Sequence, residues 1–90
     1  MTMKGKVAIV AGGGRDIGRA SAIELASKGA NVVITYHSSA ETAESAVKEI
    51  EALGVKAIAI KADLTSVADV KKTVDTTLEA FGKIDVLVHV

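Results

Sequence analysis

The 90-residue chain contains no cysteine, no proline and no tryptophan, and it has only one tyrosine and one phenylalanine. The absence of cysteine excludes disulfides, thiolate catalysis and thiolate metal sites. The absence of proline means that no strand or helix is interrupted by a residue without a backbone N–H. Because aromatic side chains are so scarce, the core has to be built from Val, Ile, Leu and Ala.

Neither sign of charge is in excess, since eleven basic residues balance eleven acidic ones and no run of like charge occurs. Capture of nucleic acid or of an anionic membrane is therefore not indicated. Long hydrophobic runs are also absent: the apolar stretch after Lys6 has about five residues, too few for a signal peptide or a membrane span. Ninety residues make one small domain at most, and we expect residues 1–90 to belong to a soluble cytoplasmic protein.

Four apolar blocks alternate with three segments that have apolar residues at helical spacing. The blocks, rich in Val, Ile and Ala, are Lys6–Ala11, Asn31–Tyr36, Val55–Ile60 and Asp85–Val90. The helical segments run from about Ile17 to Lys28, from Ser38 to a stop at Gly54, and from Ser66 to a stop at Gly82. Such alternation with short connections predicts an α/β fold with a parallel sheet.

Right-handed crossovers leave few ways to connect these elements. We predict half of a doubly wound Rossmann fold with strand order 3-2-1-4. The first two helices then cover one face of the sheet, and the third helix covers the other. Since one helix cannot cover four strands, part of the second face and the outer edge of the fourth strand should be bare.

Finer details of the helices are also predicted. Ser38 with Glu41, and Ser66 with Asp69, have the spacing of capping boxes at the starts of the second and third helices. The apolar stripe expected to be the buried face of the third helix consists of Val67, Val70, Val74, Leu78 and Phe81.

A glycine-rich turn, Gly12–Gly14, joins the first strand to the first helix. A helix N-terminus presents unpaired N–H groups and a partial positive charge, and glycines allow a phosphate to approach the backbone. The G-x-G-x-x-G spacing does not fit, because Arg15 and Ile17 stand where it needs glycine, and the Gly-Lys-Ser/Thr end of a Walker loop is absent. Flavodoxin-like or receiver-type proteins are disfavoured, since receiver domains carry acidic residues after the first strand.

The turn resembles the T-G-x-x-x-G-x-G motif of the short-chain dehydrogenase/reductase family. It matches at Gly12, Ile17 and Gly18 and departs at Ala11 and Asp16. The likeness extends over all 90 residues, and its general pattern is similar to that of bacterial 3-oxoacyl-carrier-protein reductases.

Two further motifs of the family lie on the expected strands. Asp63-Leu64 follows the third strand, where the family places an Asp and an apolar residue against adenine, and His89-Val90 aligns with the start of the N-N-A-G motif, with both Asn replaced. The resemblance implies a nicotinamide dinucleotide. The residues that we expect to bind the cofactor, from the resemblance and from the chemistry of the second strand's end, are Gly12, Gly14, Arg15, Asp16, Ile17, Gly18, Tyr36, His37, Ser38, Asp63, Leu64 and His89.

The end of the second strand favours NADP(H) over NAD(H). An acidic residue there would accept both ribose hydroxyls and repel a 2′-phosphate, but none occurs between Tyr36 and Glu41. Family members that use NADP often carry a basic residue at the position of Arg15, and a guanidinium binds phosphate through two donors. The hydroxyl of Ser38 could add a hydrogen bond. Alternatively, Arg15 is a solvated surface residue, and Ser38 or Ser39 is only a helix cap.

Asp16 and the two histidines are polar residues whose expected roles differ. A carboxylate near a pyrophosphate repels it unless it turns away, so we expect Asp16 to keep the turn geometry and bond backbone N–H groups, Arg15 or Arg19. The alternative is a turn that has lost nucleotide binding. Two lone histidines do not make a metal site; we expect His89 near the cofactor ribose and His37 at the adenosine end.

The chain lacks the residues that the family uses for catalysis, a Ser and a Tyr-x-x-x-Lys unit. The only tyrosine is Tyr36, and Ala40 stands where the lysine would be needed. We therefore expect the front portion of a longer, homo-oligomeric reductase (a dimer or tetramer) acting on a small carbonyl or alcohol. The alternative is a non-catalytic module that binds a nucleotide or pairs with a protein through its exposed sheet edge. An Ala-Gly, a Ser and a Tyr-x-x-x-Lys encoded after Val90 would favour the first hypothesis, and a stop codon the second.

Overall fold

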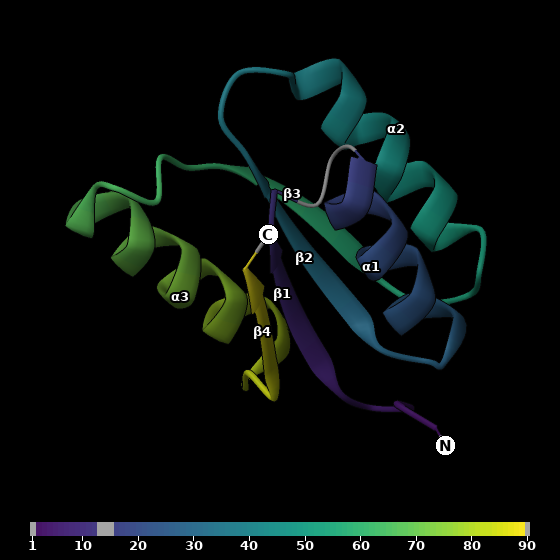
Figure 1. The fold of residues 1–90 in the computed structure, drawn as a ribbon. Helices are drawn as coiled ribbons and strands as arrows, with labels where there is room; N and C mark the ends of the chain where they lie inside the picture. The colour runs from purple at the N-terminus through teal and green to yellow at the C-terminus, as the bar shows by residue number, and fades with distance from the viewer. Residues whose placement is uncertain (1, 13–15, 90) are drawn as a thin grey trace.

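The computed structural model describes residues 2–12 and 16–89, apart from the side chain of Asp16. Four strands alternate with three helices: β1 (Val7–Ala11), α1 (Asp16–Ser27), β2 (Asn31–Tyr36), α2 (Ala40–Glu51), β3 (Ala57–Lys61), α3 (Val67–Phe81) and β4 (Val86–His89). All strand pairs are parallel, in the order β3-β2-β1-β4, which confirms the predicted half of a doubly wound sheet (Figure 1). No helix within the described ranges is long and apolar enough to cross a bilayer.

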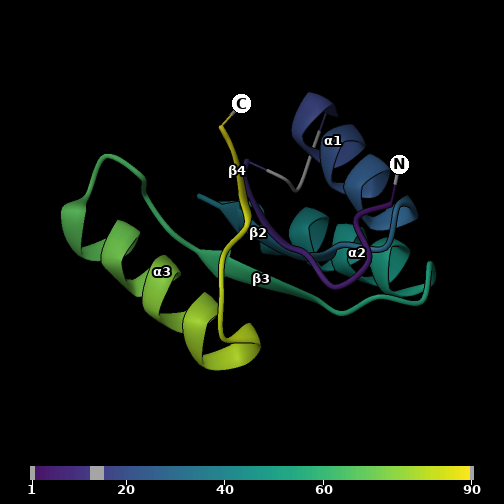
Figure 2. The ribbon, with the colours of Figure 1, turned by 90° about the horizontal axis from the view of Figure 1, so that it is seen from below.

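The sheet lies between two layers of helices, as predicted. Helices α1 and α2 lie side by side on one face and α3 lies alone on the other (Figures 1 and 2). The larger core, between the sheet and the helix pair, is made of Val10, Ala22, Ala26, Ala30, Val32, Ile34, Ala43, Ala46, Ile50 and Ala57. Every residue of β1 is buried, which explains why its apolar side chains do not alternate with polar ones.

The prediction for the buried face of α3 was largely wrong. The buried residues of α3 are Thr73 and Thr77, whereas Val67 is 85% exposed and Val70 and Leu78 are also exposed. The two threonines can face the sheet because their hydroxyls donate to the carbonyls of Asp69 and Thr73, at 2.9 and 2.7 Å. The helix is thus turned so that much of its apolar stripe is exposed, although Phe81 still packs against the cluster of Ile9, Val33, Ile60 and Ala62.

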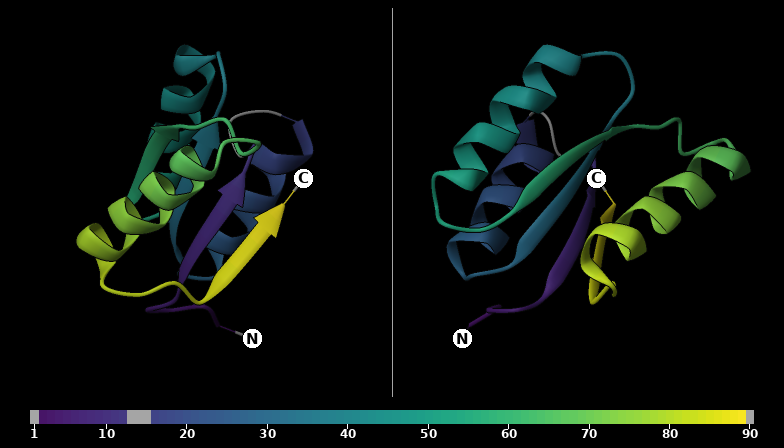
Figure 3. Two further views of the ribbon diagram at one scale, coloured as in Figure 1. Left: turned by 90° about the vertical axis from the view of Figure 1, so that its left-hand side faces the viewer. Right: turned by 180° about the vertical axis from the view of Figure 1, so that it is seen from behind.

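A groove of about 280 Å³ remains between α3 and the sheet, and we call it the α3 groove. It is lined by Ile9, Ala11, Thr35, Leu64, Val70, Thr73, Val74, Ile84, Leu87 and His89. Leu87 of β4 is 68% exposed there. Helix α3 crosses only part of this face (Figure 3), so the expected bare region is confirmed.

The two predicted helix starts had different outcomes. The N-cap of α2 is Ser39, and no side chain caps it, so the Ser38–Glu41 capping box was wrong. At α3, the Ser66 hydroxyl accepts a hydrogen bond from the Asp69 N–H at 3.4 Å, as predicted. The Asp69 carboxylate, however, bonds elsewhere, to the N–H of Asp63 at 2.8 Å.

Asp85 joins the starts of β1 and β4. Its Oδ2 accepts from the Val7 N–H at 2.9 Å and lies 3.1 Å from the Nζ of Lys83, while its own N–H donates to the Val7 carbonyl at 2.8 Å. The hydrogen bond from Val7, followed by that from Lys83, lowers the pKa of Asp85 below its ordinary value of 3.8. The ionised carboxylate therefore stabilises the pairing of β1 with β4.

This arrangement predicts a pH-dependent effect of Asp85→Asn on stability. A folded-state pKa below the unfolded value contributes stability above about pH 4, and the contribution is lost as pH falls through the folded pKa. Asp85→Asn should lower the melting temperature at pH 7, and the difference from wild type should shrink between about pH 5 and pH 2. Asp75→Asn on the exposed side of α3 is the control, with no such trend. A difference that stays constant with pH would contradict the role of the charge.

Candidate nucleotide-binding site

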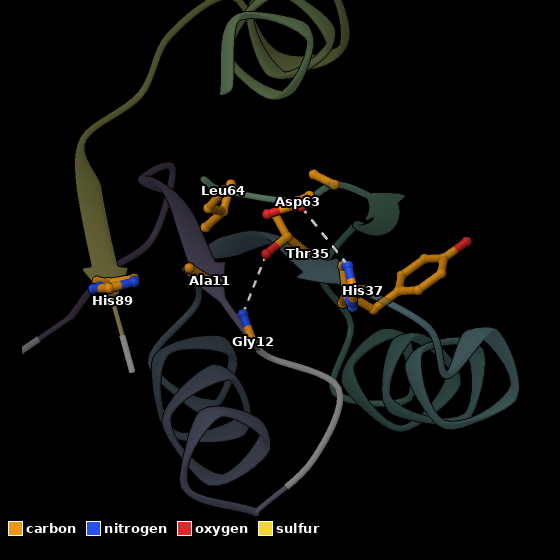
Figure 4. A pocket seen from close by; sticks show the side chains of 9 residues that line it. Ala11, Gly12, Thr35, His37, Asp63, Leu64 and His89 are labelled. Carbon is orange, nitrogen blue, oxygen red and sulfur yellow. Dashed lines mark hydrogen bonds and ion pairs between the residues drawn. The ribbon is translucent and has the colours of Figure 1, made fainter. Parts of the chain in front are cut away.

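The carboxyl ends of the four parallel strands meet at one edge of the sheet, where ligands of open α/β sheets bind. A hollow of about 200 Å³ opens there, and we call it the strand-end pocket. It is lined by Ala11, Gly12, Thr35, Tyr36, His37, Ala62, Asp63, Leu64 and His89 (Figure 4). Each of the four strands or the connection that follows it contributes at least one of these residues.

Gly12 begins the connection from β1 to α1. Its φ of +77° lies in the left-handed region that favours glycine, and a Cβ built on it would meet no atom within 4 Å. Helix α1 starts a few residues later, at Asp16, so its first unpaired N–H groups lie at this same edge. Gly18 is buried in the first turn of α1, whereas Ile17 beside it is 71% exposed.

The end of β2 forms the second side of the pocket. Tyr36 is half-buried and packs against the core beneath α1 and α2. His37 lies at the mouth with its side chain 76% exposed, and its Nε2 is 3.9 Å from Oδ2 of Asp63. That distance exceeds a hydrogen bond, so the two groups attract each other only when the imidazole is protonated.

Asp63 is held in one orientation by its own loop. Its Oδ1 accepts from both the N–H and the hydroxyl of Thr65, at 2.9 and 2.6 Å, and its N–H donates to Asp69. The hydrogen bonds from Thr65, the side-chain bond foremost, hold the pKa of Asp63 below its ordinary value. Oδ2 of this ionised carboxylate lies on the side of His37, where it can accept a hydrogen bond from a ligand (Figure 4).

His89 and Leu64 belong to both hollows. His89 ends β4 opposite Ala11, and Leu64 follows Asp63 in the connection to α3. Both line the strand-end pocket and the α3 groove, as do Ala11 and Thr35. The strand-end pocket, which has both polar and apolar lining residues, therefore continues into an apolar groove, an arrangement that suits a ligand with both charged and apolar parts.

Half of the residues singled out from the sequence lie together in this pocket: Gly12, Tyr36, His37, Asp63, Leu64 and His89. Ile17 and Gly18 are in the first turn of α1, and Ser38 is an exposed neighbour of His37, but these three do not line the hollow. Gly14, Arg15 and the side chain of Asp16 lie outside the described residues. Arg19, proposed as one partner of Asp16, bonds Glu49 and Ser45 of α2, its shortest contact being 2.7 Å to Glu49.

Sequence reasoning missed three residues that line the pocket, Ala11, Thr35 and Ala62. The two alanines carry no chemical signal. Thr35 does carry one, because it is a polar residue at the end of the aliphatic run Val32–Ile34 and is nevertheless only 2% exposed. A hydroxyl buried in a strand requires a hydrogen-bond partner, so a threonine at this position is the signal by which the sequence could have indicated a contact outside the strand.

Comparison with known proteins places this geometry in a family. The family model described as "short chain dehydrogenase" matches residues 6–90. Hydroxynaphthalene reductase arp2 of Aspergillus fumigatus is 44% identical over 88 residues, which cover 98% of this chain and 32% of that protein. Versicolorin reductase 1 of Dothistroma septosporum is 48% identical over 85 residues, covering 94% of this chain and 32% of that protein.

Solved structures agree. A short chain dehydrogenase from Burkholderia cenocepacia, in complex with NADP, has a TM-score of 0.93 and 50% identity and covers 97% of this chain and 36% of its own. A short-chain dehydrogenase/reductase from Serratia marcescens has a TM-score of 0.95 and 41% identity and covers 100% and 37%. The chain thus spans about a third of the length of the relatives it matches. On its glycine turn, its sheet order and this similarity over residues 6–90, the chain belongs to the short-chain dehydrogenase/reductase family.

Proposed function

We propose that the chain is the nucleotide-binding part of an NADP(H)-dependent oxidoreductase that transfers hydride between the nicotinamide and a carbonyl or alcohol. The observation that carries this proposal is the strand-end pocket, where a left-handed glycine and the start of α1 adjoin the ends of β2, β3 and β4. The Burkholderia relative, described in complex with NADP, supports the same cofactor class.

The residues present fit a dinucleotide. The open space at Gly12 leaves room for a pyrophosphate against the backbone, and the N-terminus of α1 supplies N–H donors and a partial positive charge. The fixed Oδ2 of Asp63 is an acceptor for an exocyclic amino group, and Leu64 offers an apolar contact to a base. His89, at the end of β4, is the residue we assign to the cofactor ribose.

NADP(H), when bound, supplies or accepts the hydride, and the residues of this chain bind and orient it. The sole tyrosine, Tyr36, packs at the end of β2 and is followed at the fourth position by Ala40. We therefore place no catalytic residue in these 90 residues. Proton transfer to the substrate requires groups from elsewhere in the protein. The relatives named above are reductases and dehydrogenases, which does not favour the non-catalytic alternative.

The preference for NADP(H) over NAD(H) rests on the end of β2. The segment Tyr36–Ala40 has no carboxylate to accept ribose hydroxyls, and His37 is exposed where a 2′-phosphate would approach. We assign Ser38 and Arg15 as further contacts of that phosphate. A cytoplasmic location, a small carbonyl or alcohol substrate and a homo-oligomeric assembly complete the proposal.

This preference can be tested by titrating the protein with NADPH and with NADH and measuring binding by the fluorescence of the reduced nicotinamide. We expect NADPH to bind at least about tenfold tighter, a difference of roughly 1.4 kcal/mol. Ser38→Asp should reduce NADPH affinity about tenfold through repulsion of the 2′-phosphate, whereas the uncharged control Ser38→Ala should change it less than about threefold. Binding of neither nucleotide would refute the nucleotide site itself, and tighter binding of NADH would refute only the NADP assignment.

A further inference from the structure

Thr35 is a buried polar residue at the end of β2 whose hydroxyl is used outside its own strand. In the sheet register it lies opposite Ala11, the last residue of β1, and this is the last pair of the β1–β2 ladder. A valine would suit such a buried strand position as well as a threonine does. The hydroxyl therefore requires an explanation other than strand formation.

The explanation is its contact with the glycine turn. The Oγ1 of Thr35 accepts a hydrogen bond from the N–H of Gly12 at 3.2 Å (Figure 4). Gly12 is the first residue after β1, and its N–H points toward the end of β2. The side chain of Thr35 thereby attaches the residue after β1 to the end of β2, one residue beyond the last paired position.

The bond lies where a small displacement has a large effect on binding. Gly12 has a left-handed backbone, and the chain leaves the sheet at this residue on its way to α1. A hydrogen bond to Gly12 holds the end of β1 against the end of β2 at the point where the chain leaves the sheet. It also uses the Gly12 N–H, so the donors left for an anion are those farther along, toward the start of α1.

Thr35 also lies between the two hollows of the site. It lines both the strand-end pocket and the α3 groove. The same residue thus anchors the phosphate-binding turn and forms part of the wall of the adjoining pocket. No other described side chain makes a hydrogen bond to the backbone of Gly12.

We propose that Thr35 is a positioning residue of the dinucleotide site, whose hydroxyl fixes the exit of the glycine turn at Gly12 and so aligns the pyrophosphate donors. The inference rests on the proposed nucleotide-binding function. It predicts that the affinity for ligands with a pyrophosphate depends on the Thr35 hydroxyl, whereas the affinity for ligands that occupy only the adenosine end does not.

Thr35→Val and Thr35→Ser test the proposal, because valine keeps the shape and loses the hydroxyl while serine keeps the hydroxyl. For Thr35→Val we expect the Kd of NADPH to rise about fivefold to tenfold, with the Kd of adenosine 2′-monophosphate within about twofold of wild type. Thr35→Ser should bring NADPH affinity back to within about threefold of wild type. Thr77→Val is the matched control, since it removes another buried threonine hydroxyl, in α3 and outside both hollows, and it should leave NADPH affinity unchanged.

Equal losses of NADPH and adenosine 2′-monophosphate, an unchanged NADPH affinity in Thr35→Val, or no recovery in Thr35→Ser would each overturn the proposal. If Thr35→Val does not unfold cooperatively, Thr35→Cys replaces it, because a thiol is a weaker acceptor than a hydroxyl, and its NADPH affinity should fall below that of Thr35→Ser. Failure of the wild-type protein to bind NADPH and NADH would instead refute the proposed function.

Discussion

Gly12→Ala is expected to weaken NADPH binding about thirtyfold or more, which corresponds to roughly 2 kcal/mol. The φ of Gly12 is +77°, and an L-residue pays about 1–2 kcal/mol to adopt a left-handed conformation. The alanine variant can relieve that strain only by rotating the backbone out of the left-handed region. Such a rotation would break the bond from the Gly12 N–H to Thr35 and move the turn that leads to α1.

The added methyl group acts in the same direction. It would meet no protein atom within 4 Å, so it costs nothing by contact with the rest of the chain. That open space is where a pyrophosphate has to approach the backbone, and the methyl group would occupy it. Conformational strain and loss of space therefore both lower the affinity for the dinucleotide.

Gly82→Ala is a closely matched control for this experiment. Gly82 has a φ of +78° and equally open surroundings, but it caps the end of α3 at the opposite edge of the sheet. Both variants should lose about 1–2 kcal/mol of stability in thermal or urea unfolding. Only Gly12→Ala should lose NADPH affinity. Equal affinity losses in the two variants would mean that the loss of NADPH affinity follows from reduced stability and that Gly12 does not contribute to the nucleotide site.

The fold could be predicted from the sequence because strong local signals agree with one another. The β-branched block Asn31–Tyr36 became β2 with the same bounds, and Gly82 ends α3 as expected. The strand order follows from alternating elements and right-handed crossovers, which depend on chain connectivity and hardly at all on individual side chains. The family resemblance rests on motifs that occur in the expected order along the strands. The family model that matches residues 6–90 confirms this resemblance.

Details that depend on tertiary fit were not predictable. The helical period identifies the apolar stripe of α3, but the rotation of the helix about its axis is set by its contact with the sheet. Thr73 and Thr77 can be buried in that contact because each hydroxyl donates a hydrogen bond to a carbonyl one turn earlier in the helix. Adjacent serines offer the same capping chemistry, so sequence could not distinguish Ser39 from Ser38.

The residues that the sequence indicates for cofactor binding include six that line the strand-end pocket, but the sequence does not indicate the hydrogen bonds that hold them. Asp63 was recognised from its place after the third strand. The bonds that orient it come from Thr65 and from Asp69, and the sequence indicates only a helix-capping role for Asp69. Such bonds depend on loop geometry, which residue spacing does not determine. The same reason hid Thr35, whose partner Gly12 is 23 positions away in the sequence.

Gly29→Ala is expected to destabilise the protein by about 2–4 kcal/mol, the largest stability effect that we predict. Gly29 lies between α1 and β2 with a φ of +102°, and a Cβ there would be 3.0 Å from the Cα and 3.1 Å from the N of Lys4. These are backbone atoms, which cannot move away as the end of a flexible side chain could. Overpacking thus adds to the cost of the left-handed conformation.

The N-terminal segment is held in place at this point by further bonds. The N–H of Met3 donates to the Lys28 carbonyl at 2.6 Å, and the N–H of Asn31 donates to the Lys6 carbonyl at 2.9 Å. A methyl group on Gly29 has to displace residues 3–4 and should therefore weaken the bond from Met3 to Lys28. The bond from Asn31 to Lys6 lies outside the contact and should remain. For a domain of this size the expected loss lowers the melting temperature by about 10–25 °C.

Gly54→Ala separates conformational strain from close contact, because Gly54 has a φ of +91° and nothing within 4 Å of its built Cβ. It should cost only about 1–2 kcal/mol. Removal of residues 1–4 completes a double-mutant cycle: without Lys4, Gly29→Ala should cost no more than Gly54→Ala. A cost of Gly29→Ala that persists in the shortened chain would show that its cause is the backbone conformation of Gly29 and not the approach of Lys4. The start of β1 would then be held by the Asp85 bond, by its pairing with β2 and β4 and by the backbone bonds of Met3 and Lys6, and not by the packing of Lys4 on Gly29.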